Sequence, residues 1–222
     1  MFCCGSKLCG GGVIAAVFGA AALFVGTLAP ALADGHTKGQ PETELKIGEK
    51  APDFTLTDHT GKSHKLSDYK GKIVVLEWFN PECPFVVYAH GDGPLHDMGN
   101  KEMKDGVVWF AINSGAEGEQ GTGLEKNIRY AKEWEMGYPI LFDESGDVGR
   151  MYMAKRTPQM YIIDKEGVLR YNGALDNAPM GKKDGEYKDY LVVALQQVKN
   201  GETVSESETK PYGCNVKYRK RR

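Results

Sequence analysis

The sequence predicts an α/β fold in which buried strands alternate with amphipathic helices. Residues 73–79 are a run of β-branched and aromatic residues typical of a buried strand, and residues 107–112 are a second apolar run of this kind. Residues 124–136 and 187–199 instead place their apolar residues at helical spacing. The predicted order from residue 73 to residue 199, β-α-β-α-β-β-α, indicates one sheet with helices packed on it.

The first 33 residues have the features of a signal peptide. An apolar, glycine-rich stretch from Leu8 to Leu28 is followed by Ala31-Leu32-Ala33, a small-x-small pattern of the kind that a signal peptidase cleaves. The alternative is an uncleaved anchor, because residues 8–28 are long enough to span a bilayer. Both interpretations predict an exported protein, with membrane contact only through this segment if it is not cleaved.

Three further segments are expected after residue 33. Residues 34–46 are polar and predict a flexible leader, residues 47–200 predict the folded domain, and residues 201–222 predict a polar tail. Residues 51–57 and 63–66 flank a turn at 58–62, which predicts a β-hairpin at the start of the domain. The chain has 28 Lys+Arg and 30 Asp+Glu, and this near balance gives no indication of a nucleic-acid partner.

Two cysteines lie outside the predicted signal peptide. Cys3, Cys4 and Cys9 belong to residues 1–33, whereas Cys83 and Cys214 do not. An exported protein with two cysteines can hold a disulfide. Cys83 and Cys214 are therefore the thiols around which we expect the chemistry.

Cys83 is the main candidate nucleophile. It follows the strand at 73–79 and precedes Pro84, and proline suits the first position of a helix because its missing N–H would be unpaired there. The N-terminus of a helix carries free N–H groups and partial positive charge, which favour the nucleophilic thiolate form of cysteine. The alternative is a buried structural thiol.

Three segments resemble the thioredoxin-like fold in its redoxin and AhpC/TSA, peroxiredoxin-like branch, and in particular its exported bacterial members. They are residues 77–86 (EWFNPECPFV), 156–158 (RTP) and 210–218 (KPYGCNVKY). The resemblance covers about residues 47–218 and implies a three-layer α/β/α sandwich with an N-terminal hairpin extension and a C-terminal tail. It implies a thiol oxidoreductase that needs no cofactor or metal and works in the bacterial periplasm.

The resemblance also implies a site that departs from the usual patterns. Thioredoxin-type sites resemble Cys-x-x-Cys-Pro, but Asn80 stands three residues before Cys83, so a dithiol mechanism needs Cys214 as its second thiol. Peroxidatic sites resemble Pro-x-x-x-Thr-x-x-Cys with a distal arginine. Here Asn80 replaces the threonine, Leu76 replaces the proline, and the spacing of Arg156 does not match. Asn80 can offer a hydrogen bond but no charge.

Pro158 resembles the cis-proline that faces the active cysteine in thioredoxin-like proteins. The backbone at such a proline offers an extended edge to which a substrate chain can add as a β-strand. We therefore expect Thr157 and Pro158, together with Trp78 and Pro84 on either side of the cysteine, to bind substrate. The alternative is an ordinary trans proline in a loop.

Glu77 is a carboxylate in an otherwise apolar strand, six residues before Cys83. A buried carboxyl group can relay a proton to or from a nearby thiol, which makes Glu77 a catalytic candidate. The alternative is a carboxylate that points to a loop or pairs with a lysine such as Lys72. His90 lies two helical turns beyond Cys83, about 10 Å of rise, which is too far for a direct pair with the thiol.

The sequence therefore predicts an exported thiol oxidoreductase. Cys83 would attack a peroxide or a protein disulfide, Cys214 would resolve the sulfenic acid or mixed disulfide, and an external thiol reductant would reset the pair. One alternative is a weak peroxidase that uses Cys83 alone. The other is a non-catalytic thiol module that binds a metal such as copper, or a partner protein, although no spacing typical of metal ligands is present.

Overall fold

A computed structural model describes residues 45–183 and 185–220. The predicted signal peptide and residues 34–44 of the predicted leader lie outside the described residues. Within the described part of the chain, none of the helices has the length and apolar character needed to cross a membrane.

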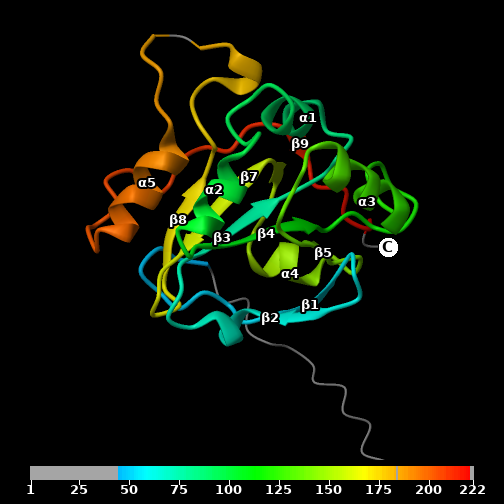
Figure 1. Cartoon of the computed structure of the whole chain (residues 1–222), viewed down its shortest axis with the longest axis horizontal. Helices are drawn as coiled ribbons and strands as arrows, with labels where there is room; N and C mark the ends of the chain where they lie inside the picture. The colour runs from blue at the N-terminus through cyan, green and yellow to red at the C-terminus, as the bar shows by residue number, and fades with distance from the viewer. Residues whose placement is uncertain (1–44, 184, 221–222) are drawn as a thin grey trace, which may run out of the picture. The chain divides into compact units, whose positions relative to one another are not determined.

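Seven strands form one central sheet in the order β2-β1-β5-β4-β3-β7-β8 (Figure 1). β3 is parallel to β4 and β4 is parallel to β5, whereas β7 pairs with β3 in the antiparallel sense. The predicted N-terminal hairpin is β1–β2, and it widens this sheet because β1 pairs with β5. The strands are β1 (Thr55–Asp58), β2 (Ser63–Lys65), β3 (Val74–Trp78), β4 (Val108–Asn113), β5 (Ile140–Phe142), β7 (Gln159–Ile163) and β8 (Leu169–Gly173).

Helices cover both faces of this sheet, which gives the predicted three-layer α/β/α sandwich. Residues of α1, α3 and α5 pack on one face, and residues of α4 and η1 pack on the other (Figure 1). The helices are α1 (Pro84–His90), α2 (Met98–Lys104), α3 (Leu124–Glu133), α4 (Asp147–Met151) and α5 (Tyr190–Lys199), with short 3-10 turns η1 (Leu66–Tyr69) and η2 (Pro179–Gly181).

β3 is buried on both faces and divides the core in two. Val75 and Phe79 belong to the core cluster under α1 and α5, whereas Leu76 and Trp78 belong to the cluster on the opposite face. Alternate side chains of a strand point to opposite faces, and a strand covered on both sides is apolar throughout. This explains the continuous apolar run, with Glu77 as its one charged residue.

The end of the chain is more ordered than the prediction of a polar tail. β9 (Cys214–Asn215) pairs antiparallel with β6 (Arg156–Thr157), with Thr157 opposite Cys214. Figure 1 shows this C-terminal segment, in red, running beside α1. Sequence analysis missed both strands because a two-residue strand has no period that could be recognised.

Asp58 at the end of β1 anchors the hairpin turn. Its carboxylate accepts hydrogen bonds from the N–H and hydroxyl of Thr60, both at 2.7 Å, and lies 2.8 Å from Nε2 of His64. Burial alone would raise the pKa of Asp58, but the hydrogen bonds from Thr60, His64 and Lys62 outweigh it and hold the pKa well below its usual range. The ionised carboxylate therefore stabilises the folded state.

We predict that the folded state loses stability in acid because the Asp58 carboxylate becomes protonated. Because the folded pKa lies below the unfolded value of about 3.9, the contribution is complete above that pH and is lost as the pH falls toward the folded pKa. Urea unfolding at pH 7, 5 and 3 should show Asp58→Asn less stable than the wild type at pH 7, with the gap shrinking by pH 3. Asp68→Asn, at an exposed carboxylate nearby, is the control. A gap that stays constant with pH would contradict the assignment.

Candidate active site

Cys83 occupies the N-cap of α1, between the end of β3 and Pro84. Its backbone N–H donates to the Asn80 carbonyl at 3.0 Å, and its own carbonyl accepts from the N–H of Val87 at 2.9 Å. The side chain is completely buried, at 0% exposure, and Sγ donates to the Thr157 carbonyl at 3.1 Å. The predicted position at a strand-to-helix junction is confirmed.

Asn80 organises the turn that delivers Cys83 to this position. Its Oδ1 accepts from the N–H of Glu82 at 2.9 Å, and its Nδ2 donates to the Gln120 carbonyl at 3.1 Å. Gly121 packs so closely that a Cβ there would overlap the Asn80 amide. The loop at 114–123 is thus docked on the active-site turn, and the Asn80 amide is engaged in holding it there.

Thr157 and Pro158 face Cys83 from the start of β7, and the peptide bond between them is cis, as predicted. The Thr157 carbonyl accepts from Cys83, while its hydroxyl is buried and has no hydrogen-bond partner within the described residues. A buried hydroxyl without a partner is costly, by about 1–3 kcal/mol. Such a group next to a reactive thiol is available to bind a substrate atom.

Cys214 reaches the same place from the C-terminal tail. It lies opposite Thr157 in the β6–β9 pair, and its side chain packs against the core cluster that contains Cys83. Burial, and then the neighbouring Cys83 thiol, raise the pKa of Cys214 to about 11, against the opposing effect of Lys217 and Arg156. Cys214 is therefore protonated at neutral pH. Both cysteines are free thiols in this structure.

Hydrogen bonds and a ring contact hold the C-terminal tail in place before and after Cys214. Before it, the Tyr212 hydroxyl donates to Asp176 at 2.7 Å, and the Tyr212 ring packs on that of Phe85 in α1. After it, the N–H of Val216 donates to the Lys155 carbonyl at 3.2 Å. The extended edge at Thr157, where we expected a substrate strand to add, is therefore occupied by the protein's own β9 in this conformation.

Of the remaining predicted substrate-binding residues, Pro84 lies exposed beside Cys83 but Trp78 does not reach the thiol. Trp78 is 0% exposed, its Nε1 donates to the hydroxyl of Ser114 at 3.0 Å, and its ring packs against Tyr152 and Tyr161. It belongs to the core cluster on the other face of the sheet from Cys83. The prediction of contact between Trp78 and substrate conflicts with this burial, and we do not retain it.

Glu77 is buried on the same face of β3 as the thiol, but its carboxylate is held by other groups. One oxygen lies 2.7 Å from Nε2 of His90, and the other accepts from Nε1 of Trp109 at 3.4 Å. His90 is the last residue of α1 and stacks on the ring of Trp134. The sequence did not predict this pair, because only the distance along the helix from Cys83 to His90 was considered there.

The second thiol that a helical Cys-x-x-Cys motif would supply is missing here. With Cys83 at the N-cap, that position is residue 86, three residues further on, where the side chain is a buried valine. Sequence analysis looked for the missing cysteine at residue 80 instead. Cys214 is the thiol that the fold brings to Cys83.

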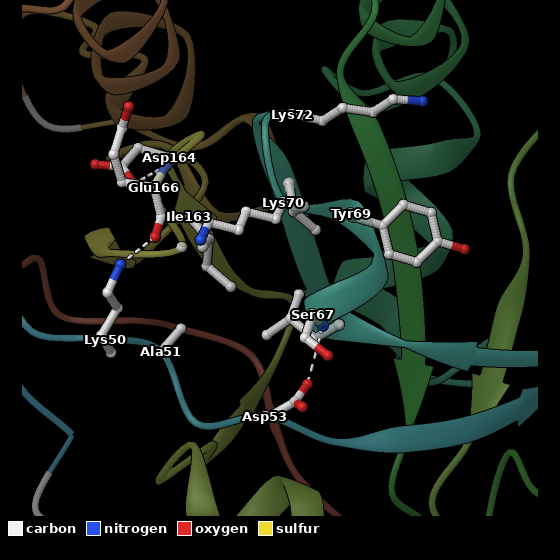
Figure 2. A pocket seen from close by; sticks show the side chains of 13 residues that line it. Lys50, Ala51, Asp53, Ser67, Tyr69, Lys70, Lys72, Ile163, Asp164 and Glu166 are labelled. Atoms are coloured by element: carbon white, nitrogen blue, oxygen red, sulfur yellow. Dashed lines mark hydrogen bonds between the residues drawn. The ribbon is translucent and has the colours of Figure 1, made fainter.

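A pocket of about 220 Å³ lies at the far end of these strands (Figure 2). Its lining includes Val74 and Ile163, which pair at one end of β3 and β7. Trp78 and Gln159 pair at the other end of these strands, and the two thiols lie beyond that end. It is therefore separate from the thiol site. No group of three or more potential metal ligands (His, Cys, Asp or Glu) is found in the part of the chain that the structure describes.

A cysteine at a helix N-cap, a cis-proline opposite it and a second thiol on the strand paired with Thr157 define a thiol-based oxidoreductase of thioredoxin-like fold. The chain belongs to the AhpC/TSA family, whose model matches residues 47–172. It is 32% identical over 133 residues to the thiol-disulfide oxidoreductase ResA of Geobacillus kaustophilus, covering 58% of this chain and 70% of ResA.

Two further comparisons agree with this assignment. The thioredoxin-like protein YneN of Bacillus subtilis is 29% identical over 154 residues, covering 69% of this chain and 84% of YneN. The crystal structure of an uncharacterized conserved protein from Geobacillus kaustophilus superposes with a TM-score of 0.72 at 29% identity, covering 81% of this chain and 96% of that one. The family match ends at residue 172, so the tail with Cys214 lies outside it.

We predict that the Glu77–His90 pair is a major source of stability near the site. Removing one partner of a buried hydrogen-bonded pair leaves the other unsatisfied and costs about 1–3 kcal/mol. Urea unfolding of Glu77→Ala should show a loss of this size, whereas Glu133→Ala, at an exposed position of α3, should change the free energy of unfolding by about 0.5 kcal/mol or less. A loss below about 1 kcal/mol for Glu77→Ala would contradict the pairing.

Proposed function

We propose that the chain works as a thiol–disulfide oxidoreductase whose redox couple is Cys83 and Cys214. The observation that carries the proposal is that Thr157 contacts both cysteines: its carbonyl accepts the hydrogen bond of Cys83, and the residue pairs with Cys214 across β6 and β9. A disulfide forms where two thiols are already close, and little movement is then needed between the reduced and oxidised states. Cys83 acts as the nucleophile and Cys214 as the resolving thiol.

The catalytic cycle follows from the positions of the two thiols and from the proton held by Cys214. The Cys83 thiolate attacks one sulfur of a substrate disulfide, forms a mixed disulfide and releases the other substrate sulfur as a thiolate. Cys214, with its pKa of about 11, keeps its proton until the mixed disulfide forms. It then loses the proton to solvent and attacks Cys83, which releases the second substrate thiolate and closes the Cys83–Cys214 disulfide. An external thiol reductant returns the pair to the dithiol.

A second candidate oxidant is a small peroxide, and the burial of Cys83 favours it. Because Cys83 has no exposed surface, a compact oxidant reaches it more easily than a protein disulfide does. The thiolate would attack one peroxide oxygen, become sulfenic acid and release the alcohol or water. Attack by Cys214 would then form the disulfide and release water. Both oxidants lead to the same Cys83–Cys214 bond.

The other candidate residues act around this pair. The unpartnered hydroxyl of Thr157 is proposed to bind the leaving atom of the substrate, and Pro84 forms the exposed rim. Asn80 holds the turn, and Glu77 holds α1 in position through His90, so both are positioning residues in this proposal. Export to the periplasm through residues 1–33 remains part of the proposal and is consistent with a chain that uses a disulfide.

We predict that one equivalent of hydrogen peroxide or of hydroxyethyl disulfide converts the two thiols into one disulfide. Non-reducing peptide mass mapping should then detect a Cys83–Cys214 peptide that disappears with dithiothreitol. In Cys214→Ser the oxidation should stop at sulfenic acid on Cys83 with peroxide and at a mixed disulfide on Cys83 with hydroxyethyl disulfide, and in Cys83→Ser the Cys214 thiol should remain unchanged.

Two outcomes would refute this cycle in different ways. If Cys83 is oxidised while Cys214 stays a free thiol in the wild type, the protein is a one-cysteine peroxidase. If neither thiol reacts and Cu(I) binds tightly and stoichiometrically only when both cysteines are present, the protein is a binding module.

We also predict that the position of the tail controls the rate of disulfide formation. Gly213 has a φ of +109°, and a Cβ there would overlap the Thr157 carbonyl, so Gly213→Ala should push β9 away from β6. The Cys83–Cys214 disulfide should then form at least about tenfold more slowly, as measured by rapid quench and mass mapping. The matched control is Gly201→Ala, because Gly201 also has a positive φ, of +73°, but open space around it. Equal rates for the two variants would contradict the role of the β6–β9 contact.

A further inference from the structure

The two sulfurs of the redox pair differ in their access to solvent. Cys83 is 0% exposed, beneath the Thr157 carbonyl and the C-terminal tail, whereas Cys214 is only half-buried. In thiol–disulfide exchange, the sulfur that is attacked is selected by access and by the ease with which the other sulfur leaves. An incoming thiolate therefore meets Cys214 first.

Two cations flank Cys214 without an acidic partner among residues 45–183 and 185–220. The Arg156 guanidinium donates to the Gly213 carbonyl at 3.4 Å and to Oδ1 of Asn215 at 2.5 Å, which are the two neighbours of Cys214 in the chain. Lys217 lies three residues further along the tail, and both cations favour the negatively charged form of Cys214. Their charge is free to attract an anion that approaches this sulfur.

We propose that Cys214 is the sulfur at which the oxidised protein accepts electrons, and that the donor is a small thiol carrying negative charge. The proposal rests on the Cys83–Cys214 disulfide described above and adds its point of entry and the class of its reductant. A protein donor that presents a strand would find the edge at Thr157 already paired with β9. A small donor needs only the exposed side of Cys214.

The exchange proceeds in two balanced steps. The donor thiolate attacks Sγ of Cys214, the Cys83–Cys214 bond breaks, and Cys83 leaves as a thiolate that later takes a proton from solvent. A second donor thiolate then attacks the donor sulfur of the mixed disulfide. This forms the donor disulfide and releases Cys214, which takes up a proton. Two donor thiolates are oxidised, and one protein disulfide is reduced.

The first test identifies the sulfur that is attacked. The full-length oxidised protein is mixed with glutathione, quenched with N-ethylmaleimide at short times and mapped by mass spectrometry. We expect glutathione on Cys214 and N-ethylmaleimide on Cys83 in the same molecules. Glutathione on Cys83 with N-ethylmaleimide on Cys214 would overturn the proposal.

The second test concerns charge. At equal thiolate concentration, anionic glutathione should reduce the protein faster than cationic cysteamine, and added salt should narrow the difference. Lys217→Gln should lower the glutathione rate about two- to threefold, as expected for the loss of one unit charge that acts through water. Lys210→Gln, at an exposed cation on the same tail, should leave the rate unchanged. Equal rates for the two thiols, or equal effects of the two variants, would overturn the assignment of an anionic donor.

A third measurement separates this inference from the proposed function. The oxidised wild type is first mapped without a donor, and glutathione is then added in the folded state and in guanidinium. We expect glutathione to enter at Cys214 at least about tenfold more often than at Cys83 in the folded protein, with the difference abolished on unfolding. Preferential entry at Cys83 would overturn the entry point even if the disulfide forms. Failure of the wild type to form the disulfide would instead refute the proposed function.

Discussion

The backbone carbonyl of Thr157 is the point on which the site depends. It accepts the hydrogen bond of Cys83, and it belongs to the residue that pairs with Cys214 across β6 and β9. One short strand therefore fixes both thiols relative to each other, although the chain brings them from positions 131 residues apart (214 − 83). The requirement for glycine at residue 213 has the same origin, because a larger residue would strike this carbonyl.

The surrounding strands and helices hold the two thiols in position relative to each other. β3 delivers Cys83 to the start of α1, and the Glu77–His90 contact ties β3 to the end of that helix. On the other side, Tyr212 and Val216 fix the tail before and after Cys214. Glu77 thus contributes by fixing the position of a helix, whereas the half-buried cations Arg156 and Lys217 contribute through the charge that they place around Cys214.

Much of the fold could be predicted because its signals are local. The apolar run of β3, the break after α1 and the proline after Cys83 each follow from the properties of a few adjacent residues, and the structure confirms them. The faces of β3 could not be predicted, since a strand buried on both sides has no alternation to show where each residue points. Trp78 was therefore expected at the substrate, but it lies in the opposite core cluster. The pairing of Glu77 with His90 joins two elements and leaves no local pattern.

The tail shows a different limit of sequence analysis. The sequence indicates Cys214 only as the remaining thiol, and no pattern in residues 201–222 predicts that β9 forms beside the cis-proline. The family match stops at residue 172, before this segment begins. The proposed redox pair therefore extends beyond the domain that identifies the family. Two proteins that share this domain but differ after it would possess different redox partners for the same cysteine, and exchanging only their last segments would exchange their chemistry.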